Sequence, residues 1–141
     1  MHRRLLLAGL GGLLILAPTS TSAQSHDPTA KQAAAFIGTW DFAMTNPAGS
    51  QQTIKIWEES GALAATVQVG KFPPIAVTRI VKDGEMLVLS VSHDARPGLR
   101  ENGEPIWAVL VLTADGETMR LAQLLEKSET IKRGTGQRRR A

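Results

Sequence analysis

The stretch Phe36-Ile37-Gly38-Thr39-Trp40-Asp41-Phe42 opens the folded part of this chain. In an extended strand, one face carries the side chains of its even-numbered residues, which are Phe36, Gly38, Trp40 and Phe42. Gly38 lacks a Cβ and allows a sharp backbone bend where the strand begins. Trp40 is a large apolar side chain that suits a pleated, half-buried surface. The stretch therefore predicts the first strand of a β-domain, with Trp40 as a core residue.

Beyond this stretch, short apolar runs alternate with turn residues. The alternation predicts eight strands, at residues 37–45, 52–57, 62–69, 75–81, 85–92, 106–113, 118–125 and 130–133. Asp83-Gly84 and Asp115-Gly116 are tight-turn signals, whereas Pro73-Pro74 interrupts strand pairing. The even spacing is typical of an all-β sandwich or barrel. Short connections favour an eight-stranded antiparallel up-and-down β-barrel, which removes its exposed edges by closing.

Residues 1–23 have the pattern of a signal peptide. A positive start at His2, Arg3 and Arg4 precedes the apolar run from Leu5 to Ala17, which is too short to span a bilayer comfortably. Small residues follow at a plausible cleavage site. The pattern predicts export, with a periplasmic or secreted location and no stable membrane anchor, and leaves open whether a twin-arginine route is used.

The remaining chain divides into three parts. Residues 24–35 form a lead-in segment in which Asp27 and Pro28 predict the start of a short helix. Residues 36–134 form the β-barrel domain. Residues 135–141 are predicted to be a basic disordered tail that frays from Gly134 onward.

Charge and cysteine content exclude several classes of function. The chain has 16 basic and 13 acidic side chains, and both ends are basic. Without Arg3, Arg4 and the three arginines at 138–140, acidic side chains outnumber basic ones, so the body is not a nucleic-acid platform. No cysteine is present, which removes disulfides, thiol nucleophiles and cysteine-based metal sites.

No catalytic constellation is recognisable. His26 and His93 are the only histidines after the signal peptide, and they lie far apart in the sequence. His93 and Asp94 are neighbours that would point to opposite faces of a strand. No nucleophile elbow or phosphate-binding loop is present. The sequence therefore predicts a protein that is not an enzyme and that has no metal or cofactor.

The Gly38-Thr39-Trp40 opening, the lead-in helix and the strand count together resemble lipocalins and other calycins. That resemblance implies a late basic residue packed over the opening tryptophan, a role that falls to Arg133 or to Lys132. A second, narrower resemblance is to the opening of avidins, through Gly49-Ser50 and the residues at 61–63. The chain lacks tyrosine, which argues against an avidin-type biotin pocket.

Three residues are candidates for contact with a ligand. Arg79 alternates with Ile75, Val77 and Val81, so it could share an inward face with them, or it could be solvated if Ile80 points inward instead. Trp57 and Trp107 are candidate lumen or rim aromatics, with packing in the core or on the outer surface as the alternative.

The calycin resemblance implies a non-catalytic binding module with a small apolar ligand in its barrel. Two alternatives stay open: a protein-binding barrel, such as a protease inhibitor that uses residues 24–35, and a structural envelope protein whose barrel is filled by side chains.

Overall fold

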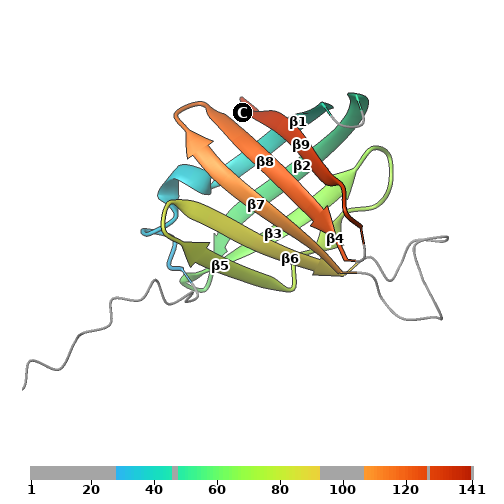
Figure 1. Cartoon of the computed structure of the whole chain (residues 1–141). Coiled ribbons are helices and arrows are strands. Elements are labelled where there is room, and N and C mark those ends of the chain that lie inside the picture. Colours follow the sequence, from blue (N-terminus) through green and yellow to red (C-terminus); the bar gives the residue numbers. More distant parts are fainter. Residues whose placement is uncertain (1–27, 46–47, 93–106, 127, 141) are drawn as a thin grey trace, which may run out of the picture.

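The computed structural model describes residues 28–45, 48–92, 107–126 and 128–140. These residues form an antiparallel sheet of nine strands with almost no helix (Figure 1). A 3₁₀-helix, η1, covers Ala34–Phe36. The strands are β1 Gly38–Thr45, β2 Ala48–Glu59, β3 Ala62–Val69, β4 Ile75–Ala76, β5 Arg79–Asp83, β6 Met86–Ser92, β7 Trp107–Asp115, β8 Thr118–Leu125 and β9 Ile131–Arg138.

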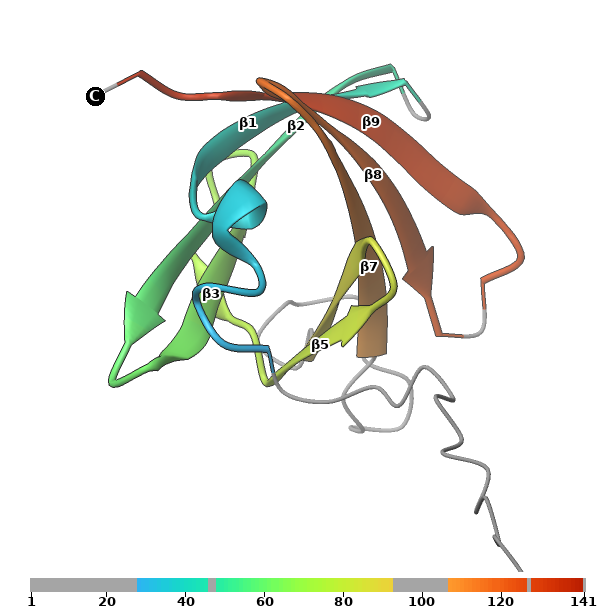
Figure 2. The ribbon, with the colours of Figure 1, turned by 90° about the vertical axis from the view of Figure 1, so that its left-hand side faces the viewer.

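The strand order confirms the expected all-β, up-and-down arrangement. Consecutive strands pair from β5 to β9 and from β4 back to β1, and β1 pairs with β9 to join the two halves. The sheet curls strongly, so that β3 and β5 approach from opposite sides (Figure 2). The first and last strands are thus neighbours. The sheet is not closed by strand pairing all the way round as the sequence predicted, because β4 and β5 remain its two edge strands.

The number of strands differs from expectation because the fourth strand is broken. Ile75 pairs with β3, but Val77 donates its N–H to Ala65 and Thr78 then donates to Ser90 of β6. The chain changes partner strands between these two residues, which splits the predicted strand at 75–81 into β4 and β5. We call this junction between β3 and β5 the seam.

The predicted disordered tail is wrong, because β9 continues through Gly134 and Gly136 to Arg138. The two glycines lie opposite Met44 and Phe42 of β1. A Cβ on Gly136 would lie 2.5 Å from Phe42 Cε1. Because these two positions of β9 have no side chain, the large side chains of Met44 and Phe42 fit beside them. Glycine here serves close packing rather than flexibility.

The interior is occupied by side chains that alternate along the strands. Trp40, Ile54, Leu87, Leu89 and Leu112 are each fully buried. The lead-in contributes Ala33 and Phe36 to the same core. The short helix expected in the lead-in is the 3₁₀-helix η1, which follows a turn, and the lead-in lies across one end of the curled sheet (Figure 2).

Several sequence expectations concern residues outside the described ranges. These are the signal peptide at 1–23, the helix cap at Asp27, and the histidines at 26 and 93 with Asp94.

Candidate functional site

One end of the barrel is closed by a cation over the opening tryptophan, but the cation is not Arg133. The guanidinium carbon of Arg138 lies 4.4 Å from the centre of the Trp40 ring, whereas Arg133 is exposed. Arg138 also donates hydrogen bonds to the carbonyl oxygens of Ile37 and Ala35. Arg138 reaches the Trp40 ring because β9 extends as far as Arg138. This end lies five residues beyond the one that the sequence predicted.

The seam is the other irregular part of the barrel. β3 pairs with β4 only at Thr66 and Val67, and Val77 adds one backbone bond to Ala65. At its far end, Ala62 forms a bridge with Thr29 of the lead-in. Between Ala62 and Ala65, the edge of β3 that faces the seam has no strand paired with it in the described chain.

A cavity of about 450 Å³ opens at this gap. This volume lies within the range of about 300–1,000 Å³ that is usual for small-molecule sites. Its walls come from the lead-in, β3 and the β4–β5 junction, and its lining residues are Pro28, Ala62, Leu63, Ala64, Val77, Thr78, Arg79 and Ile80. Six of the eight lining residues have apolar side chains, polar and apolar atoms share the lining surface about equally, and the one charged group is the guanidinium of Arg79.

Arg79 is held at the cavity by its neighbour. Both the N–H and the hydroxyl of Thr78 donate to the carbonyl oxygen of Ser90, each over 2.9 Å. Ile80 packs against the core, whereas Arg79 pairs with Ser90 on the outer face and is exposed. Of the two alternatives for Arg79, the structure shows the one in which Ile80 points inward and Arg79 is solvated, because the break at the seam shifts the alternation by one residue. Within the described chain, the Arg79 guanidinium has no hydrogen bond or ion pair.

The two candidate tryptophans do not line this cavity. Trp57 lies on the outer face of β2, where the Lys55 ammonium sits 5.5 Å from its ring centre. Trp107 lies on the outer face of β7 and is 43% exposed. Their outer positions match the alternative that the sequence left open for both residues.

Inside the barrel, two amides form a polar pair that the sequence analysis did not identify. The Gln52 Nε2 atom donates to Gln123 Oε1 over 2.5 Å, and both side chains are at least 95% buried. The Gln52 Oε1 atom has no partner within the described chain. The alternation of side chains along β2 and β8 is the signal that could have predicted that both amides point into the barrel.

A surface ion pair joins the start and end of the barrel. Arg139 donates two hydrogen bonds to the Asp41 carboxylate, at 2.6 and 2.9 Å. The hydrogen bond from Arg139 holds the pKa of Asp41 below its usual value. Thr53 donates a further bond to the same carboxylate.

In the described parts of the chain, no group of three histidine, cysteine or carboxylate residues could hold a metal ion. The same parts contain no helix that is both long and apolar enough to cross a membrane.

No protein-family model and no curated protein matches the chain. Among solved structures, the chain is similar to a mutant of the fluorescent protein UnaG, with a TM-score of 0.46 and 11% identity over 77% of this chain and 99% of that chain. The lipocalin-type assignment stays a prediction from the sequence.

Proposed function

We propose that this protein is a non-catalytic binding module that takes a small amphipathic molecule at the seam. The observation that carries the proposal is a cavity lined by six apolar side chains, with one cation, the Arg79 guanidinium, at its edge. An apolar body would contact Leu63, Val77 and Ile80, and removal of that surface from water contributes about 25 cal/mol per Å². An anionic head would pair with Arg79, whose planar fork suits a carboxylate, sulfonate or phosphate.

The proposed ligand position differs from the lumen site that the calycin resemblance implies. The buried side chains form one core cluster inside the barrel, and the cavity that we propose as the site lies at the seam. The unpaired edge of β3 also offers backbone groups to polar atoms of a ligand.

The matched dyes 1-anilinonaphthalene-8-sulfonate and N-phenyl-1-naphthylamine test this proposal, because they share one apolar body and differ in the sulfonate. We expect saturable fluorescence enhancement with the anionic dye. Arg79→Gln should weaken the anionic dye about tenfold and leave the neutral dye unchanged, since a charge-assisted bond contributes about 1.5 kcal/mol or more. Ala64→Phe should fill the cavity and weaken both dyes.

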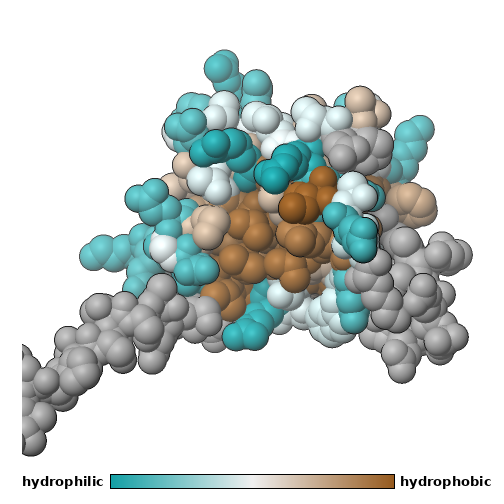
Figure 3. All heavy atoms as spheres, in the orientation of Figure 1, coloured by the Kyte–Doolittle hydropathy of each residue, from teal (hydrophilic) through white to brown (hydrophobic). Residues whose placement is uncertain are grey.

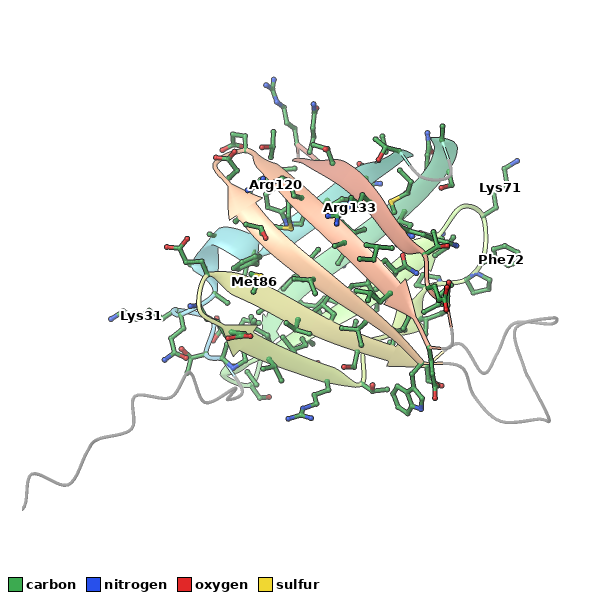
Figure 4. The ribbon with its side chains drawn as sticks, viewed as in Figure 1. Lys31, Lys71, Phe72, Met86, Arg120 and Arg133 are labelled. Atoms are coloured by element: carbon green, nitrogen blue, oxygen red, sulfur yellow. The ribbon has the colours of Figure 1, made fainter. Side chains whose placement is uncertain are left out.

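Two controls separate the seam from other surfaces. Lys71→Gln removes a cation on the exposed turn after β3, where its side chain points into solvent (Figure 4). Val109→Lys places a charge on the outer face of β7. Neither change should affect binding at the seam. Equal binding by Arg79→Gln, Ala64→Phe and the unmodified chain would refute the proposal.

We further propose that the protein works outside the cytoplasm, in the periplasm or as a secreted protein. The support is the charged start, apolar run and small residues of positions 1–23. The intact mass of protein from the cell envelope should show loss of about the first 23 residues. Full-length chain in the cytoplasm would contradict export.

A further inference from the structure

The lead-in enters the barrel at the seam. Thr29 forms an antiparallel bridge with Ala62 of β3, and the buried Pro28 lies in the wall of the seam cavity. Figure 2 shows this part of the chain, in blue, between β3 and β5. Pro28 is the first residue that the structure describes. The residues predicted to precede it in the exported chain, 24–27, therefore join the fold at the cavity wall.

The bridge fixes a register for the residues before it. In an antiparallel pair, one step back along one strand matches one step forward along the other. Pro28 is therefore opposite Leu63, and Asp27 is placed opposite Ala64. Leu63 and Ala64 line the cavity, and the edge of β3 at these two residues has no strand paired with it in the described chain. The register thus continues into the unpaired part of the seam.

The unpaired part of the seam has a definite length. It begins at the bridge to Ala62 and ends at Ala65, whose carbonyl oxygen accepts the N–H of Val77. β3 advances about 10 Å between these two residues. Pro28 and Asp27 fill the two positions in between, and residues 24–26 must then leave the sheet.

The register also places the Asp27 side chain on the face that carries the Arg79 guanidinium. Ala64 is paired with Trp57 on the outer face of the sheet, and residues paired across two strands share a face. Arg79 lies on the outer face of β5, across the cavity from Ala64. Asp27 is the only acidic residue among residues 24–27. The one anion of this segment is thus directed toward the one cation of the cavity.

The turn of the lead-in is capped without Asp27. The N–H of Gln32 donates to the Thr29 hydroxyl oxygen over 3.3 Å, and the N–H of Thr29 donates to the Gln32 Oε1 atom over 3.1 Å. This reciprocal pair of hydrogen bonds is a capping box, with Thr29 at the cap position. The Asp27 carboxylate is therefore available for another partner.

We infer that residues 24–27 occupy the seam cavity in the exported chain, where Asp27 extends the pairing along β3 and its carboxylate binds the Arg79 guanidinium. The segment is then an occupant of the cavity that the chain itself supplies, and an anionic ligand must displace Asp27 to reach Arg79. This consequence for ligands rests on the proposed function, whereas the position of the segment does not. An exposed ion pair changes an equilibrium by about two- to fivefold, so the segment adjusts ligand affinity and does not block the site.

An engineered disulfide tests the position of the segment without any ligand. The chain has no cysteine, so Asp27→Cys/Ala64→Cys can form only one disulfide within a chain. The bond from Val77 shows that the backbone carbonyl of Ala65 points into the seam, so that of Ala64 points away from it. Residues 27 and 64 are then a non-hydrogen-bonded pair, with Cα atoms about 4.5 Å apart. A disulfide spans this distance.

We expect this pair to crosslink within one chain in a glutathione buffer, and the control is Asp27→Cys/Gln68→Cys. Gln68 lies on the same face of β3, about 13 Å further along the strand and past the end of the unpaired part. The control should crosslink about tenfold more slowly, because Cα atoms more than about 7 Å apart are not bridged without backbone movement. Mass spectrometry identifies the linked peptides, and urea midpoints of the reduced chains show that both variants fold. Equal rates, or a disulfide between two chains in place of one within a chain, would overturn the inference.

The anionic dye 1-anilinonaphthalene-8-sulfonate tests the ion pair. All titrations use a Val109→Lys background, because Val109 is 37% exposed in the apolar area on the outer face of the sheet (Figure 3), and a charge there disfavours dye binding away from the seam. Asp27→Asn should tighten dye binding about two- to fivefold, since it frees Arg79. Asp83→Asn removes a matched acid from the outer face of β5, about 13 Å along the strand from Arg79. It should leave dye binding unchanged at about 0.15 M salt, which screens charges at that distance.

A second background separates the ion pair from the ligand site. With Arg79→Gln present, Asp27→Asn should have no effect on dye binding, because its partner has been removed. If the crosslink forms but Arg79→Gln leaves dye binding unchanged, the proposed ligand site is refuted and the position of the segment stands. If Arg79→Gln weakens dye binding but Asp27→Asn does not tighten it, the ligand site stands and the pairing of Asp27 with Arg79 is refuted.

Discussion

The Arg138 guanidinium carbon lies 4.4 Å from the centre of the Trp40 ring, and this contact joins the end of the last strand to the start of the first. The Trp40 indole N–H donates to the carbonyl oxygen of Phe36 over 2.9 Å, which fixes the ring orientation. Arg138 covers the ring and donates to carbonyl groups just before β1. One arginine therefore hydrogen-bonds two backbone carbonyl groups before β1 and also covers the face of the Trp40 ring.

We expect Trp40→Ala to lower the free energy of unfolding by about 3–5 kcal/mol, the usual cost of truncating a buried tryptophan. Arg138→Ala should cost less, about 1–3 kcal/mol, because it removes a cation–π contact and leaves carbonyl groups unpaired. The two losses should be non-additive, since the residues share one contact. Urea denaturation of the double-mutant cycle measures this coupling.

Two further variants separate the roles of Arg138. Arg138→Lys keeps the charge but loses the fork that reaches both carbonyl groups, so it should recover only part of the stability. Arg133→Ala, on the same strand, should change stability by no more than about 0.5 kcal/mol in dilute solution. Strict additivity of the Trp40 and Arg138 losses would contradict the shared contact.

Local patterns predicted most of the fold. Residues 62–69 and 118–125 form strands with the expected bounds, because alternating side chains and turn residues specify them directly. The division of strand 75–81 was missed, because the change of partner at the seam depends on the curvature of the whole sheet. The end of β9 was missed because Gly134 and Gly136 are typical of a flexible tail. In the structure these positions must be glycine, because a Cβ there would collide with Met44 or Phe42 of β1.

The site was less predictable than the fold. Arg79 could be identified as a cation beside apolar residues, but its side of the sheet depends on the break at the seam. The cavity itself could not be predicted, because its walls come from the lead-in, from β3 and from the β4–β5 junction, which lie apart in the sequence.

Gly136 should not tolerate a side chain. In Gly136→Ala the new Cβ would meet the Phe42 ring, and overpacking of this kind costs about 1–3 kcal/mol. Phe42→Leu in the same chain should recover part of the loss, because it shortens the opposing side chain. Thr135→Ala, one residue away and exposed, is the control and should be close to neutral. Thermal and urea midpoints compare the four chains, and an undiminished midpoint for Gly136→Ala would contradict the close packing.

The buried amide pair should show strong coupling. Gln123→Leu removes the acceptor of Gln52 and leaves a buried amide unpaired, which should cost about 1–3 kcal/mol. Gln52→Leu should have a similar effect. The double variant should be close to neutral or more stable, since two apolar groups of similar size replace the pair. If the double variant loses the sum of the single losses in urea, the amides do not act as a pair.

Asp41 should contribute a small stabilisation that disappears in acid. Its hydrogen bond with Arg139 lowers its pKa in the folded state, so the folded protein holds the carboxylate more strongly than the unfolded chain does. The stabilisation is complete above the unfolded value of about 3.8 and is lost as the pH falls through the lower folded pKa. The effect is small because the Asp41 and Arg139 side chains are 47% and 56% exposed, where solvent screens the pair.

Asp41→Asn should therefore lower the urea midpoint slightly at neutral pH and converge with the unmodified chain near pH 2. Arg139→Gln should behave in the same way, and the carboxyl carbon of Asp41, followed by NMR, should then titrate closer to its ordinary value. An Asp41→Asn variant whose midpoint stays below that of the unmodified chain by a constant amount at every pH would show that the loss comes from packing, not from the ion pair.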